Sequence, residues 1–164
     1  FKIQKVQHVL SKEQFEDGAS YPVFSAETKN NGIIGYTSHP EFICDDATPT
    51  YVIFGDHTRA FNITHQSFSV VSTAKVLKVN IALSDKELLF ILTIWKKGIP
   101  NLGYARHWSV AKGCSLLLPV NEQDKLDKTY MARYVNAIEK LIIKDVVKYK
   151  DDIIGKTREI LDCD

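Results

Sequence analysis

Several large classes of protein are excluded by what this sequence lacks. With 164 residues, of which 45% are hydrophobic and 25% charged, its composition is that of a globular protein and excludes a disordered chain. The longest apolar stretches, such as residues 88–95, are far shorter than the roughly 20 residues that cross a bilayer. No basic and then apolar leader opens the chain, so we expect neither secretion nor a membrane partner.

Cysteine and methionine are also scarce. Cys44, Cys114 and Cys163 are an odd number, widely spaced and in no Cys-x-x-Cys pair. This disfavours a disulfide framework and a zinc knuckle, and we expect the reducing environment of the cytoplasm. The chain opens with Phe1 and its one methionine is Met131, so we expect a segment excised from a longer polypeptide.

Motifs of catalysis and cofactor binding are missing too. The sequence has no glycine-rich phosphate loop, no Gly-x-Ser-x-Gly elbow and no His-Glu-x-x-His metal helix. His57 and His65 stand eight residues apart with Asp56 beside the first, but no third ligand falls at a metal-binding spacing. The carboxylates of Asp45 and Asp46 fit a solvated loop. We therefore expect no catalytic residue, no metal site and no cofactor bound by this chain.

What the sequence does contain is basic charge gathered in two segments without acids. Residues 57–84 hold three lysine or arginine residues and residues 88–121 hold four, although the whole chain carries a net charge of only +1. Residues 1–56, in contrast, hold four lysines against eight acids. Such segments favour a face that binds a polyanion, while chance clustering is the alternative.

Short runs with the pattern of strands fill the first 120 residues. They lie at 21–24, 32–36, 51–54, 59–63, 68–71, 75–79, 102–108 and 114–119. The Asn-Asn-Gly tripeptide at 30–32 predicts a turn, since these residues accept positive φ angles. Short strands joined by turns favour a curved, mainly antiparallel sheet. Cys114 then begins an apolar strand as an ordinary buried thiol.

Two helices complete an α+β fold. Ser84 and Glu87 form a capping box that predicts a helix over 84–97, which we expect to cover one face of the sheet. From Met131 to Ile160 apolar residues recur at steps of three and four, which predicts a long helix like those of coiled coils. This divides the chain into a globular domain over 1–127 and a helix over 128–164. Because the apolar surface exceeds one stripe, we expect a partner helix, with packing on the helix's own domain as the alternative.

Three sequence blocks carry a resemblance to a known family. They are Tyr-Pro-Val-Phe-Ser at 21–25 with Asn-Asn-Gly-Ile-Ile-Gly-Tyr at 30–36, then Ile-Phe-Gly-Asp-His-Thr-Arg at 53–59 with Phe68 and Lys-Val-Leu at 75–77, then Leu-Leu-Leu-Pro-Val at 116–120 leading into Asp127, Tyr130 and Met131. In this order they resemble the target recognition domain of specificity (S) subunits of type I restriction–modification systems. The resemblance covers about residues 20–155.

This resemblance implies a DNA-reading module without catalysis of its own. Its partners are double-stranded DNA, a DNA methyltransferase subunit that binds S-adenosylmethionine, a restriction and translocase subunit, and a second copy of the chain through the C-terminal helix. The family has two recognition domains and two spacer helices, whereas this chain has room for one of each. It is therefore a half-subunit that dimerises, an excised half, or the recognition domain of a fused type II methyltransferase–nuclease.

The candidate DNA-binding residues are polar, basic or aromatic and lie mainly in turns and in the segments without acids. Lysine and arginine bind phosphates, while asparagine, arginine, serine and threonine read base edges. The set is Thr28, Lys29, Asn30, Asn31, Tyr36, His57, Thr58, Arg59, Lys96, Lys97, Tyr104, Arg106, His107 and Lys112.

Each of these candidates has a simpler interpretation. The loop 28–31 can be a plain hairpin turn and the lysines can be solvated charges. We expect Asp56 to cap a turn or orient Arg59, because a carboxylate would repel phosphate. A protein-interaction or small-ligand module that uses Tyr36, Phe61 and Trp108 as its surface is the alternative function.

Overall fold

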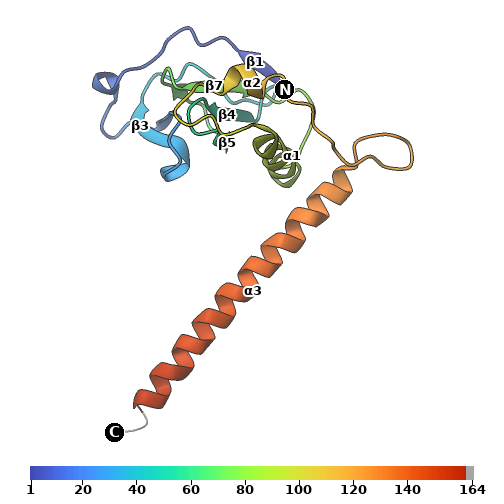
Figure 1. The fold of residues 1–164 in the computed structure, drawn as a ribbon. Coiled ribbons are helices and arrows are strands. Elements are labelled where there is room, and N and C mark those ends of the chain that lie inside the picture. The colour runs from blue at the N-terminus through green and yellow to red at the C-terminus, as the bar shows by residue number, and fades with distance from the viewer. Residues whose placement is uncertain (162–164) are drawn as a thin grey trace.

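The computed structural model describes the backbone of residues 1–161 and the side chains of residues 1–154. Two small β-sheets and one packed helix come first in the chain, and a single long helix follows them (Figure 1). This arrangement confirms the α+β class and the long C-terminal helix. Cys163 lies outside the described residues.

The larger sheet contains four antiparallel strands. In spatial order they are β1 (Lys2–Gln4), β7 (Ala74–Lys78), β4 (Tyr51–Gly55) and β5 (Phe61–Thr64). β4 is buried over its whole length because it is an inner strand that is covered on both faces. The apolar run at 51–54 therefore correctly predicts a buried strand.

Alternate residues of β4 belong to two separate cores. Val52 and Phe54 pack with Leu88, Leu92 and Trp95 of the packed helix, together with Leu77. Tyr51 and Ile53 pack with Phe24, Phe42, Phe68 and Val70 on the other face. Successive side chains of a strand point to opposite faces, so this one strand holds the two layers together.

The smaller sheet contains the strands β3 (Ile33–Thr37), β2 (Tyr21–Phe24) and β6 (Ser69–Val70). β2 pairs antiparallel with β3 but parallel with β6. The expected mainly antiparallel strands are thus present, but they form two sheets and include one parallel pair. β6 is followed directly by a turn, in which the Ala74 amide donates a hydrogen bond to the Val71 carbonyl, and β7 begins at Ala74.

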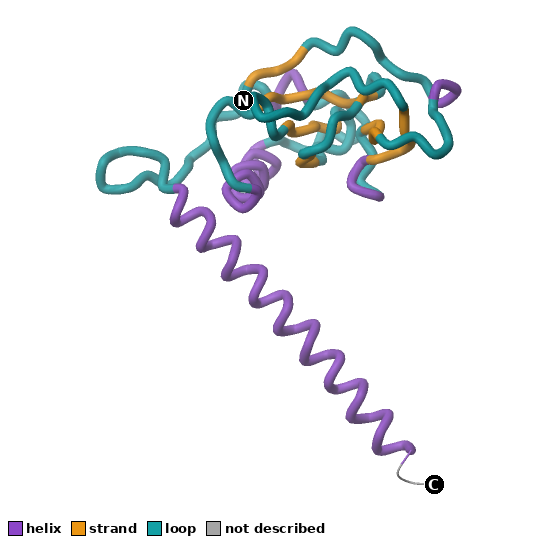
Figure 2. Tube along the Cα trace, turned by 180° about the vertical axis from the view of Figure 1, so that it is seen from behind, coloured by secondary structure: helices purple, strands orange, loops and turns teal. Residues whose placement is uncertain are grey.

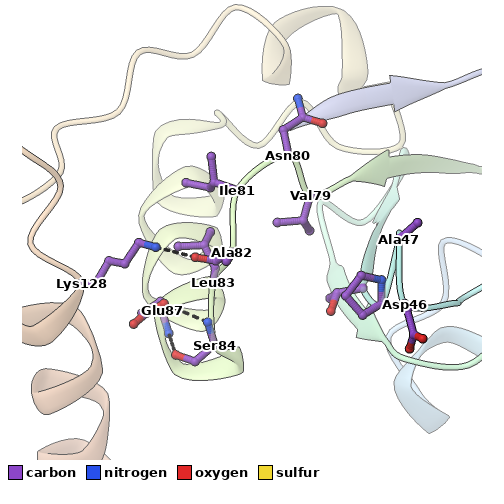
Figure 3. Close-up of a pocket in the computed structure, with 12 residues that line it drawn as sticks. Asp46, Ala47, Val79, Asn80, Ile81, Ala82, Leu83, Ser84, Glu87 and Lys128 are labelled. Atoms are coloured by element: carbon purple, nitrogen blue, oxygen red, sulfur yellow. Dashed lines mark hydrogen bonds between the residues drawn. The ribbon is translucent and has the colours of Figure 1, made fainter.

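The helix α1 (Asp85–Gly98) covers one face of the larger sheet, as predicted. The Ser84 side chain accepts a hydrogen bond from the Glu87 amide, and the Glu87 carboxylate accepts one from the Ser84 amide, so the capping box is complete (Figure 3). The Trp95 indole donates to the Ala111 carbonyl over 2.8 Å, which ties the helix to the segment after it.

The predicted strands at 102–108 and 114–119 are wrong. Residues 101–107 form a loop that enters the short helix α2 (Trp108–Ala111), because a buried histidine holds the backbone group that a strand would pair. Residues 114–119 pair with no described strand, and Leu117 is 93% exposed. Cys114 is half-buried where a buried thiol was expected, and it lies outside any strand.

The helix α3 (Lys128–Leu161) begins against α1 and then leaves the rest of the protein (Figures 1 and 2). Met131 is fully buried, and the Phe90 ring of α1 packs edge-on against Tyr130 and Tyr134. Lys86 forms an ion pair with Glu139 over 2.9 Å. The start of α3 therefore packs on its own domain, while residues 140–154 are exposed. No described helix is long and apolar enough to cross a membrane.

Candidate nucleic-acid interface

Five of the predicted DNA-binding residues line one open groove, although they come from distant parts of the sequence. The groove has a volume of about 870 Å³ and lies between the 25–34 segment and the turn that joins β4 to β5. The five residues are Lys29, Asn30, His57, Thr58 and Tyr104. We call it the His57–Tyr104 groove.

The turn at 28–31 has the left-handed geometry expected from its sequence. Asn30, Asn31 and Gly32 have φ angles of 47°, 51° and 81°. Gly32 suits this backbone conformation, and a Cβ there would also lie 2.5 Å from the buried Asn62 amide nitrogen, so that side chain would have to shift. Thr28 lines a second hollow of about 300 Å³ with Asn62 and with Lys96 of α1, so the turn lies between two hollows.

The β4–β5 turn presents His57 and Thr58 to the groove but turns Arg59 away from it. The Thr58 hydroxyl donates to the Ala26 carbonyl over 2.6 Å, which brings this turn against the 25–34 segment. Arg59 adopts a left-handed φ of 59°, and its guanidinium donates to the Ile99 carbonyl over 2.9 Å, just beyond the end of α1. The expectation that Asp56 orients Arg59 is therefore wrong.

Asp56 instead organises the loop that precedes α2. Its side chain is almost fully buried and accepts a hydrogen bond of 2.7 Å from the Trp108 amide. Its second carboxylate oxygen lies 3.7 Å from the Arg106 guanidinium and 3.9 Å from the Lys75 ammonium. A buried carboxylate needs such partners, and here they hold Arg106 beside the β4–β5 turn.

His107, predicted to contact DNA, has no exposed surface. Its Nδ1 lies 3.0 Å from the Asp56 carbonyl, and its Nε2 accepts a hydrogen bond of 3.1 Å from the Leu102 amide. This pairing assigns a neutral imidazole with the proton on Nδ1. Both ring nitrogens are thus used in shaping the loop, and no part of the ring is left to reach a ligand.

Tyr104 and Arg106, in contrast, point outward from this fixed loop. Tyr104 is 88% exposed and its ring stacks on the His57 imidazole, with centroids 4.7 Å apart and planes 7° from parallel. The Arg106 side chain is 61% exposed. The loop therefore presents one aromatic ring and one guanidinium close to the turn that carries His57.

The remaining predicted residues do not line this groove. Tyr36 is exposed on β3, and Lys112 is exposed just after α2. Lys97 lines an apolar hollow of about 540 Å³ between α1 and α3. Asn31 is exposed on the 28–31 turn without lining the groove. These residues therefore lie on separate parts of the surface.

The aromatic surface of the alternative function is not formed. Phe61 and Trp108 are half-buried and both pack against Phe54 in the core beneath α1, with ring centroids 4.9 and 5.6 Å from it. Tyr36 is apart from them on the other sheet.

The two histidines considered as metal ligands have different surroundings. His57 lines the groove, and His65 pairs with Asp85 at 2.9 Å. The described residues contain no group of three or more His, Cys, Asp or Glu that could hold a metal ion.

Lys12 and Ser25 also line the groove, and sequence reasoning did not select them. Lys12 lies in a short 3₁₀ helix (Lys12–Gln14) within the acidic N-terminal third, so local charge gave no signal. Ser25 directly follows β2 and reads as part of that strand. Lys12 reaches the groove only through the tertiary fold, whereas Ser25 lies in the same 25–34 segment as Lys29 and Asn30.

Comparison with known proteins yields a likeness of fold. No family model matches the sequence, and no curated protein matches it. The fold is similar to that in a crystal structure of the HsdS subunit from Thermoanaerobacter tengcongensis, with a TM-score of 0.50 and 12% sequence identity. The similarity covers 87% of this chain and 35% of the other, so this chain spans about a third of that subunit's length.

Proposed function

We propose that this chain is a sequence-specific DNA-reading segment of a type I restriction–modification specificity subunit. The observation that supports this most directly is the His57–Tyr104 groove, where polar and basic side chains from three separate turns come together. The fold likeness to an HsdS subunit is a second, independent support. A third support is the ordered set of sequence blocks that resembles the recognition domains of this family.

We expect the side chains around the groove to have different roles in DNA recognition. Lys29 and Lys96 are exposed cations that suit DNA phosphates, which position a protein without reading sequence. Asn30 can exchange hydrogen bonds with a base edge, and Arg106 can fork to the O6 and N7 atoms of guanine. The Thr58 hydroxyl is instead used within the protein, between the Ala26 carbonyl and the Ala60 amide. Asp56 and His107 position the loop of Arg106 from the protein interior and do not contact DNA themselves.

The chemistry of restriction and modification belongs to the partners of this chain. A DNA methyltransferase subunit supplies S-adenosylmethionine and methyl transfer, and a restriction and translocase subunit supplies cleavage. The chain itself contributes DNA recognition and no catalytic group. A second copy, joined through the exposed part of α3, would supply a second recognition domain.

The methylation pattern of the source genome tests this proposal. Deleting the gene should erase methylation at one sequence motif throughout the genome, and restoring it should bring that motif back. Restoring a gene with Asn30→Ala and Arg106→Ala should leave the motif unmethylated or widen it. A methylation pattern that is unchanged by the deletion would contradict the proposal.

A further inference from the structure

Tyr104 and His57 form a flat aromatic platform at the side of the groove. Tyr104 as a residue is 88% exposed although the imidazole covers one face of its ring, at a centroid distance of 4.7 Å. The opposite face is therefore open to solvent and can accept another planar group. The imidazole that supports the tyrosine ring is half-buried.

The backbone on both sides of Tyr104 is held in place before any ligand binds. Gly103 has a left-handed φ of 68°, and its amide donates to the Asn101 side chain over 3.2 Å. On the other side of Tyr104, the buried His107 ring is bonded to the Asp56 carbonyl. A planar ligand that stacks on Tyr104 therefore orders little additional backbone, which lowers the cost of binding.

The groove beside the platform has the size and charge for a nucleotide. Its volume of about 870 Å³ lies within the range of small-molecule sites. Lys12 and Lys29 line it, and Glu27 is the one acid among the lining residues. Ser25 and Asn30 add side chains that can hydrogen-bond a base. The lining thus combines a stacking surface, net positive charge and polar groups.

A base that is paired within a duplex cannot use such a platform, because both of its faces are covered by neighbouring bases. A base that has left the stack can, and stacking on an aromatic ring tolerates any base. We propose that the groove binds one unpaired nucleotide, with its base on the open face of Tyr104 and its phosphates at Lys12 and Lys29. This inference rests on the DNA-binding function proposed above and names the form of DNA that the groove holds.

The test compares two duplexes of the same sequence, one fully paired and one with a single bulged 2-aminopurine, bound by the full chain at the same low salt. The bulged duplex should bind about 5- to 150-fold more tightly, the range that one base–aromatic stack supplies, and its fluorescence should be quenched. Tyr104→Ala should remove both effects and Tyr104→Phe should keep them. Tyr21→Ala, which removes a partly exposed tyrosine of β2 that does not line the groove, is the matched control and should change neither.

Equal binding of the two duplexes by the unmodified chain would overturn this inference and leave DNA binding itself intact. A preference for the bulge that survives Tyr104→Ala would overturn it as well, because another part of the surface would then hold the nucleotide. Binding to neither duplex would contradict the proposed function along with the inference.

Discussion

Asp56 is the residue on which the geometry of the Tyr104 and Arg106 loop depends. Removing its carboxylate with Asp56→Ala leaves the Trp108 amide without its acceptor, and this should lower the free energy of unfolding by about 1–3 kcal/mol. Asp56→Asn keeps an oxygen acceptor and should cost less. Urea unfolding measures both, with Asp46→Ala in an exposed loop as the control, expected to stay within about 0.5 kcal/mol. An Asp56→Ala variant as stable as the control would contradict this role.

The contact between Gly32 and Asn62 can also be tested, because Gly18 has nearly the same φ angle and is available as the control. Gly18 has a φ of 78°, close to the 81° of Gly32, but a Cβ at Gly18 meets no atom within 4 Å. Gly18→Ala should therefore cost about 1–2 kcal/mol from the left-handed backbone alone. Gly32→Ala should cost more, because its Cβ meets the Asn62 amide group.

The double variant isolates this contact. Asn62→Ala removes a buried nitrogen that has no hydrogen-bond partner in the described structure, so it should reduce the cost of Gly32→Ala to that of Gly18→Ala. Thermal or urea unfolding of the four variants gives the comparison. Equal costs for Gly18→Ala and Gly32→Ala alone would show that the Asn62 contact is relieved without strain.

His65 makes part of the stability dependent on pH. The hydrogen bond to Asp85 raises the pKa of the imidazole above its ordinary value of 6.5, and partial burial opposes this rise. Because the pKa is raised in the folded state, the contribution of the His65–Asp85 pair to the free energy of unfolding is complete below pH 6.5. This contribution disappears as the pH rises through the raised pKa. The ring is half exposed, so the contribution stays under about 1 kcal/mol.

The measurement is the difference in unfolding free energy between the unmodified chain and His65→Gln, taken at about pH 6 and about pH 9. We expect the difference to be larger at the lower pH. His8→Gln, at an exposed histidine, should show no such trend. A difference for His65→Gln that is constant across this range would exclude the ion pair as its source.

At the scale of elements, α3 has an apolar face that its own domain covers only at the start. Large apolar side chains from Leu141 to Val147 are 50–61% exposed. We expect the chain to sediment above the mass of a monomer, and Ile142→Glu with Val146→Glu to return it to a monomer. Lys140→Glu with Lys144→Glu on the same helix is the control and should leave association unchanged. A monomer in the unmodified chain would contradict a second copy as the partner.

The helices and strands that are determined by their local sequence could be predicted from it. The capping box of Ser84 and Glu87 predicts the start of α1, and the apolar run at 51–54 predicts β4. The segment 102–108 has a strand-like pattern but folds as a loop, because its hydrogen bonds go to Asp56, about 50 residues earlier in the chain. Such a tertiary contact leaves no mark on local periodicity.

The same distinction separates the predictable and unpredictable parts of the candidate site. The turn at 28–31 and the residues His57, Thr58 and Tyr104 could be selected because turns and polar side chains are visible locally. That these lie in one groove, that Arg59 points to the end of α1 and that His107 is buried all depend on packing between distant segments.

At the scale of the whole molecule, we expect the His57–Tyr104 groove and its rim to form a surface that binds DNA. Binding of the full chain to a random-sequence duplex at increasing salt tests this most directly, since each phosphate contact adds about 0.9 to the slope of log affinity against log salt. The unmodified chain should bind at low salt and weaken steeply. Lys29→Ala with Lys96→Ala should reduce the slope by about 1.8, while Lys140→Ala with Lys144→Ala on α3 should leave it unchanged. An affinity that does not depend on salt, or a slope that Lys29 and Lys96 do not alter, would contradict the proposed DNA surface.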